Sequence, residues 1–138
     1  MTISSSNPYP LMNHPLYPRF YREVTKDNDI LAVYHYGSSV NRTDFRDIDI
    51  CIISYCDDQS AYFDRFLHYS GSYAAMGPIP LDIMLFSLLP LYIKIEVIRE
   101  GIPVFVRDDD SLFEKILKTN RQWDDYEPSY RIMIKRRK

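Results

Sequence analysis

Apolar residues gather in four short runs separated by polar stretches. ILAVYHY, Ile30–Tyr36, and IDICIIS, Ile48–Ser54, are nearly continuous and rich in β-branched and aromatic residues, which is typical of strands covered on both faces. A third run begins near Leu81, and IPVFV forms a fourth. Because Pro103 cannot donate to a sheet ladder, the fourth strand is expected at an edge. The pattern predicts a four-stranded sheet.

Helical spacing of apolar residues dominates between these runs. Helices are predicted at residues 19–28, 57–71, 88–99 and 108–126, with Pro18 at the first start and Gly71 at the second end. Asp57 or Asp58 is expected to cap the second helix and Asp110 or Ser111 the last. The faces expected to pack are Phe20 and Val24, then Phe63, Phe66 and Leu67, then Leu91, Ile95 and Ile98, and finally Leu112, Ile116 and Trp123. This order predicts an α/β (α+β) fold with a mixed four-stranded sheet and helices packed on it.

The length of 138 residues suits one domain. Four prolines fall within residues 1–18, which are expected to form an extended N-terminal extension before a domain at 19–138. The polar N-terminus does not resemble a signal peptide, and the longest apolar run, LFSLLPLYI, is too short to span a bilayer. A cytoplasmic protein without membrane contact is expected.

The charge of the chain argues against one class of partner. The formal net charge is −2 and the pI is near 5.9, so the protein lacks the overall basic character of proteins that grip long nucleic acid. One local exception is the terminal RIMIKRRK, which gathers five cations. This basic tail is interpreted either as a solvated helix end or as a docking segment.

Carboxylates interrupt two of the predicted strands. Asp47 and Asp49 are two residues apart, so on a strand they project to one face about 7 Å apart. Their mutual repulsion is relieved when a cation lies between them, and hard oxygen ligands suit Mg²⁺. Asp82 lies in the apolar run PLDIMLF and joins them if that strand neighbours the second. The spacing predicts a carboxylate cluster at one edge of the sheet.

Gly37 and Ser38 follow directly after the first strand. A glycine lets a phosphate approach the backbone, free N–H groups at a helical turn favour an anion, and the serine hydroxyl adds a donor. Each feature alone has an ordinary explanation: a turn for Gly-Ser, a loop or cap for Asp-x-Asp, and an arginine partner for Asp82. In combination, an anion cradle and a metal clamp favour phosphoryl or nucleotidyl transfer.

These segments resemble a known family, the minimal nucleotidyltransferases of the DNA polymerase β superfamily. The resemblance rests on VYHYGSS, RDIDICI and PLDIMLF, and on IKIEVIREGIPVFVRD, which is similar to the helix, Glu-Gly turn and final strand of that family. It covers roughly residues 19–120 and implies the nucleotidyltransferase fold. Small members of the family are often encoded beside an all-helical HEPN toxin and act as antitoxins, and some add AMP to a toxin tyrosine.

The resemblance also implies roles for individual residues. Gly37 and Ser38 would hold the triphosphate of ATP, Asp47 and Asp49 would bind two Mg²⁺ ions, and Asp82 would complete the metal cluster and help activate the attacking hydroxyl. The family often places a basic residue and then Ala-Arg-Gly after Gly-Ser, whereas this chain has Ser39, Val40, Asn41 and Arg42. Arg42 and Arg46 are therefore expected to supply the charge facing the phosphates from shifted positions.

Two functions of different classes follow. One is an enzyme that transfers AMP, or another nucleoside monophosphate, to a hydroxyl on a HEPN-type toxin; a small molecule or an RNA end is the alternative acceptor. The other is a binding module, an antitoxin that neutralises its partner by complex formation, with catalysis secondary or lost. An oligomer is compatible with either function. Two further residues are interpreted structurally: His35 as a core histidine and Cys51 as a buried small hydrophobe.

Overall fold

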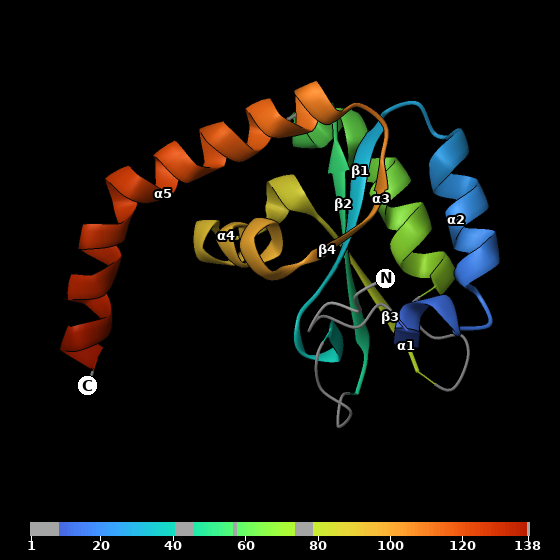
Figure 1. Cartoon of the computed structure of the whole chain (residues 1–138), viewed down its shortest axis with the longest axis horizontal. Coiled ribbons are helices and arrows are strands. Elements are labelled where there is room, and N and C mark those ends of the chain that lie inside the picture. The colour runs from blue at the N-terminus through green and yellow to red at the C-terminus, as the bar shows by residue number, and fades with distance from the viewer. Residues whose placement is uncertain (1–8, 41–45, 57, 74–78, 138) are drawn as a thin grey trace, which may run out of the picture.

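The computed structural model describes residues 9–40, 46–56, 58–73 and 79–137, which are organised around one mixed sheet (Figure 1). The sheet order is β3-β2-β1-β4, where β1 is Ile30–Tyr36, β2 Ile48–Ser54, β3 Leu81–Leu85 and β4 Ile102–Val106. β1 pairs antiparallel with both β2 and β4, whereas β2 and β3 are parallel. The predicted fold class and the edge position of β4 are confirmed.

Helices cover both faces of the sheet. α2 and α3 lie on one side and α4 and the first part of α5 on the other, as Figure 1 shows. The helices are α1 Tyr9–Met12, α2 Tyr17–Lys26, α3 Gln59–Tyr73, α4 Leu91–Glu100 and α5 Asp109–Arg137, with short 3₁₀ turns η1 at Ser38–Val40 and η2 at Phe86–Leu88.

The alternation of side chains along β2 divides the core into two layers. Ile48, Ile50 and Ile52 pack with α2 and α3, whereas Cys51 and Ile53 pack with α4 and α5. All five are buried, so β2 is covered on both faces, as its continuous apolar run predicts. Cys51 is a free, buried thiol, which confirms its interpretation as a small hydrophobe.

The N-terminal segment packs onto the domain. The expectation of an extended chain is wrong for residues 9–12 and 17–18, which are helical. Leu11 is fully buried in the core formed with α2 and α3. The His14 ring donates from Nε2 to the carbonyl oxygen of Ile79 at 2.6 Å and accepts from the Leu16 N–H at 3.1 Å. The burial of Leu11 and the hydrogen bonds of the His14 ring therefore hold the segment against the domain, although its proline content alone favours an extended chain.

The predicted packing face of α3 is largely wrong. Phe63 and Leu67 are 43% and 50% exposed, and the helix continues past Gly71 to Tyr73. The buried face consists of Tyr62, Phe66, Tyr69 and Tyr73. Tyrosines can occupy it because their hydroxyls find acceptors: Tyr62 and Tyr69 each donate to Asp27 Oδ2 at 3.1 Å, and Tyr73 donates to Glu23.

Two helix starts also differ from expectation. α4 begins at Leu91, after Pro90, rather than at residue 88, and its buried residues are Ile95 and Val97. The cap of α5 is Asp108, not Asp110 or Ser111: its carboxylate accepts from the Ser111 hydroxyl at 2.6 Å and the Asp110 N–H at 3.2 Å. Ser111 participates in this cap as donor instead of as the capping acceptor.

α5 continues to Arg137, well beyond the predicted end at residue 126, and contains Pro128. Of its predicted packing residues, Leu112 is buried and Ile116 packs partly against the same core. Within the described residues, no helix combines the length and the apolar character that crossing a membrane requires.

Arg107 joins β4 to the end of α2. Its Nε donates to the carbonyl oxygen of Ile30 at 2.8 Å, and its Nη2 donates to those of Thr25 at 2.9 Å and Asp27 at 3.1 Å. These carbonyls lie at the C-terminus of α2 and just beyond it, where a cation is favourable.

Replacing Arg107 with methionine is expected to lower the free energy of unfolding by about 3 kcal/mol, because several charge-assisted hydrogen bonds are lost together. The matched control Arg121→Met lies on an exposed turn of α5 and should change it by less than about 0.5 kcal/mol. Urea unfolding followed by circular dichroism measures both values. Equal stability of the two variants would show that Arg107 does not hold α2.

Candidate active site

Three carboxylates converge where β2 and β3 begin. The parallel register places Asp49 directly beside Asp82, and Asp47 immediately precedes β2. One carboxylate oxygen from each residue lies within 4.8 Å of the others. The predicted cluster of Asp47, Asp49 and Asp82 is therefore confirmed as a geometric feature.

Burial and like charge both act on the central carboxylate. Asp47 and Asp49 are half-buried and Asp82 is exposed. Burial, followed by the charges of Asp47 and Asp82, raises the pKa of Asp49 to about 7. A hydrogen bond between Asp49 and Asp82 acts in the same direction. Without a cation the protonated form of Asp49 is thus unusually favourable.

The turn after β1 lies against this cluster. Gly37 has a φ of +82°, a left-handed conformation that side chains disfavour. A Cβ at Gly37 would lie 2.3 Å from Asp49 Oδ2, so a side chain here would collide with the carboxylate. Glycine is therefore required both for the backbone turn and for the close approach of Asp49.

The two serines after Gly37 have different surroundings. Ser38 is exposed at the start of η1, whereas Ser39 is buried and its Oγ lies 2.7 Å from Nε2 of His35. Burial lowers the pKa of His35 to about 4, so the ring is neutral near pH 7. His35 and Ser39 brace the turn from inside, which confirms the structural interpretation of His35 and leaves the Ser38 hydroxyl facing outward.

Of the two arginines predicted to face the phosphates, the structure describes one. Arg46 is exposed and directly precedes Asp47 at the entrance to β2. Arg42 lies outside the described residues.

Sequence reasoning missed Glu96, which lies near the cluster. The charge of Glu96, on α4, contributes to the raised pKa values of both Asp49 and Tyr36. Tyr36 is the last residue of β1 and pairs with Asp49 across the sheet. Glu96 lies between the buried residues Ile95 and Val97, a position that carries no motif; only the packing of α4 brings its charge near the site.

The donor set fits a divalent cation. Three carboxylates supply hard oxygen ligands at the start of adjacent strands, and burial together with the neighbouring negative charges raises the pKa of Asp49, so a cation would favour its ionised form. Beside them, the exposed Ser38 begins the turn η1 directly after Gly37, and its hydroxyl is a donor suited to an anion. Metal ligands and an anion-binding turn together suit reactions of nucleoside triphosphates.

Comparison with known families agrees with this geometry. Residues 21–110 match the family described as "Polymerase beta, Nucleotidyltransferase". The chain belongs to this nucleotidyltransferase family. The match extends from α2 to the start of α5 and includes the whole carboxylate cluster. The reaction class of this family is the transfer of a nucleotidyl group.

The chain is also similar to individual relatives and solved structures. MJ1547 of Methanocaldococcus jannaschii, named as a candidate protein adenylyltransferase, is 31% identical over 104 residues, which are 74% of this chain and 76% of the relative. Among solved structures, a toxin–antitoxin complex with AMP-PNP matches with a TM-score of 0.60 at 16% identity, covering 85% of this chain and 94% of that chain. A complex of a tri-AMPylated Shewanella oneidensis HEPN toxin with its MNT antitoxin matches at 0.56, also at 16% identity, covering 85% and 92%. These structures share the fold.

Gly37→Ala is expected to weaken Mg²⁺ binding and to destabilise the protein by more than about 1 kcal/mol, because the added methyl group meets Asp49 and strains the turn. Gly71→Ala is the matched control: it lies in α3 with open space around it, and should be neutral or stabilising by up to about 1 kcal/mol. Titration calorimetry and thermal unfolding test both variants. If Gly37→Ala bound Mg²⁺ with the affinity of the wild type, the predicted collision between a side chain at residue 37 and Asp49 would be contradicted.

The raised pKa of Asp49 also predicts a pH dependence. Because the folded state favours protonated Asp49, the metal-free protein should lose stability as the pH rises from the ordinary carboxyl range through about 7. Asp49→Asn should remove this loss, so its stability relative to the wild type should rise from about pH 4 to about pH 7 and stay constant at higher pH. Melting temperatures measured in a chelator across this range test the sign.

Added Mg²⁺ should raise the melting temperature of the wild type at high pH, where the carboxylates are ionised, and have little effect on Asp49→Asn. If the melting temperatures of the wild type and Asp49→Asn varied with pH in the same way, the pH dependence could not be assigned to Asp49.

Proposed function

We propose that this protein transfers AMP from ATP to a hydroxyl group of a partner protein, and that it does so with Mg²⁺. The convergence of Asp47, Asp49 and Asp82 beside the Gly37 turn is the observation that carries the proposal. The family match supports the reaction class, and the relative named as a candidate protein adenylyltransferase supports a protein as acceptor.

Each residue of the site has a proposed role. Asp47, Asp49 and Asp82 would hold two Mg²⁺ ions, and the metal would neutralise phosphate charge. The backbone at Gly37 and the hydroxyl of Ser38 bind the triphosphate, and Arg46 with Arg42 adds positive charge near it. Asp82 is the most exposed of the three carboxylates, so it is best placed to accept the proton of an incoming hydroxyl.

A HEPN-type toxin is the proposed partner, and a tyrosine hydroxyl on it the proposed acceptor. The structural neighbours are toxin–antitoxin complexes, one with AMP-PNP and another with an AMPylated HEPN toxin, which supports this assignment. The slight net negative charge of the chain does not favour a long nucleic acid as substrate. AMPylation of the toxin would make this protein its antitoxin, acting in the cytoplasm where ATP is present.

Substitution of the carboxylates tests the chemistry. Asp47→Asn and Asp49→Asn keep the size of each side chain while removing a charge, and should reduce AMP transfer by about a hundredfold or more. Asp64→Asn, on the exposed surface of α3, is the control and should retain activity. Radiolabel from α-labelled ATP transferred to a HEPN-type protein of the same genome measures the effect.

The identity of the acceptor can be read separately by intact mass. A gain of one or more AMP units on the HEPN-type protein, lost when its tyrosines are replaced by phenylalanine, agrees with the proposal. Label that appears only on added RNA or on a small molecule would overturn the acceptor and leave nucleotidyl transfer standing. Toxin neutralisation that persists in Asp49→Asn without any transfer would favour the binding module instead.

A further inference from the structure

The segment that precedes α2 meets the domain beside the active site. In Figure 1, α1 lies next to the start of β3, at the end of the sheet where β2 and β3 begin, and the His14 ring contacts Ile79 there. The family match begins at residue 21, so this contact lies outside the part of the chain that the family shares. A role for the segment must therefore be argued from the contacts of this chain alone.

The surroundings of His14 determine which ring nitrogen carries the proton. The Leu16 N–H donates to Nδ1 at 3.1 Å, so this nitrogen is the acceptor of the neutral ring. Nε2 therefore carries the proton and donates it to the carbonyl oxygen of Ile79 at 2.6 Å. His14 is only 5% exposed, so water competes little for either hydrogen bond. The ring joins two backbone segments that are distant in sequence.

This link lies close to the third carboxylate of the site. Ile79 precedes Asp82, the second residue of β3, by three positions. Between them, the carbonyl oxygen of Pro80 accepts from the Ile48 N–H at 3.0 Å, at the point where β2 begins. His14 thus holds the chain directly before the paired starts of the two strands that carry the carboxylates.

The position of Asp82 depends strongly on the backbone around it. Asp82 is exposed, so burial does not fix its side chain. Its neighbours Leu81 and Ile83 are buried in the same cluster as Leu11, and alternation directs Asp82 to the opposite face. Within the described sheet β3 has a neighbouring strand on one side only, and the ends of such strands open most readily.

We propose that His14 is a positioning residue for Asp82. Its hydrogen bond to the Ile79 carbonyl oxygen fixes the start of β3, so that the Asp82 carboxylate is held beside those of Asp47 and Asp49. A site that is already in its binding geometry loses less conformational freedom when a cation binds. The inference rests on the proposed function, because binding of Mg²⁺ by these carboxylates is the step that His14 serves.

Two substitutions separate the hydrogen bonds of the ring. In His14→Gln the amide nitrogen takes the place of Nε2 and can still donate to Ile79. In His14→Asn the amide oxygen takes the place of Nδ1, which keeps the bond from Leu16 and loses the bond to Ile79. Because the proposed role depends on the bond to Ile79, His14→Gln should behave like the wild type and His14→Asn should not.

Amide hydrogen exchange tests the start of the strands without metal or activity. In the full-length, metal-free protein, His14→Asn should raise the exchange rate of the Ile48 N–H by about tenfold, because the chain that carries its acceptor on Pro80 is no longer held. His14→Gln should change this rate by less than about threefold. The Ile52 N–H, in the centre of the sheet, should be unaffected by either substitution.

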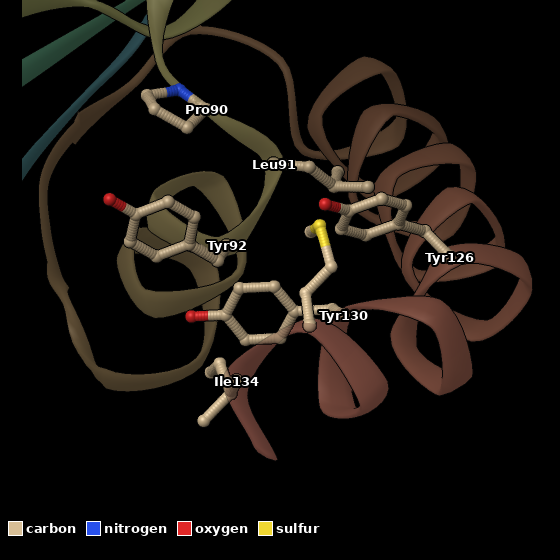
Figure 2. Close-up of a pocket in the computed structure, with 7 residues that line it drawn as sticks. Pro90, Leu91, Tyr92, Tyr126, Tyr130 and Ile134 are labelled. Carbon is tan, nitrogen blue, oxygen red and sulfur yellow. The ribbon is translucent and has the colours of Figure 1, made fainter. Parts of the chain in front are cut away.

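A second variant controls for a general loss of stability. Figure 2 shows a pocket between α4 and the last part of α5, where Tyr92 stacks on Tyr130 with ring centroids 5.6 Å apart. None of the three carboxylates is among the described residues that line it. Tyr130→Ala removes this stacking and should lower the melting temperature, while exchange at Ile48 and the affinity for metal stay as in the wild type.

Binding of Mn²⁺, measured by titration calorimetry, tests the site itself. His14→Asn should weaken binding by about fivefold or more, and His14→Gln by less than about twofold. In an Asp82→Asn background His14→Asn should have no further effect, because the ligand that it positions is absent. A general structural role for His14 would instead weaken binding by the same factor in both backgrounds.

Several results would overturn the positioning role and leave the proposed nucleotidyl transfer standing. These are unchanged Ile48 exchange or unchanged Mn²⁺ affinity in His14→Asn, an equal effect of His14→Asn in the Asp82→Asn background, and a loss in His14→Gln as large as in His14→Asn. Loss of Mn²⁺ affinity in Tyr130→Ala would also overturn it, because stability alone would then explain the effect. A wild-type protein that binds no Mn²⁺ would overturn the proposed function, and this inference with it.

Discussion

The repulsion among three carboxylates is the constraint on which the site depends. Asp47, Asp49 and Asp82 are brought within 4.8 Å by two parallel strands, and burial of Asp49 increases the cost of ionising all three. Strands that were free to shift would separate these charges. A slip of β2 by one residue would move the Asp49 carboxylate into the apolar layer of Ile48 and Ile50, and the cost of burying it there holds the register. Apolar packing thus holds a charged arrangement that is unfavourable until a cation binds.

Close packing also determines the turn after β1. Gly37 passes so close to Asp49 that no side chain fits between them, and the neutral pair of His35 and Ser39 fixes the turn from inside. Polar groups that face inward therefore have structural roles, whereas Ser38 and Arg46 face outward. Where a backbone turn must approach a phosphate closely, we expect some of its residues to support the turn and their neighbours to bind the ligand.

The sheet was predictable because its two central strands are nearly continuous apolar runs, and the carboxylate cluster because side chains two residues apart on a strand share a face. Asp82 was recognisable for the same reason, as an acid inside such a run. The buried tyrosines of α3 were not, because their burial depends on hydrogen bonds that their hydroxyls donate to Glu23 on α2 and to Asp27 just after it. Leu11 and Glu96 were missed for a related reason: each gains its place through packing between segments distant in sequence, which local patterns do not record.

Direct location of the metal tests the central claim. In crystals of the protein grown with Mn²⁺ and a non-hydrolysable ATP analogue, anomalous diffraction should place manganese among the carboxylate oxygens of Asp47, Asp49 and Asp82, with the triphosphate against Gly37 and Ser38. Anomalous density that lies elsewhere, or a triphosphate bound away from this turn while the three carboxylates remain free of metal, would contradict the account.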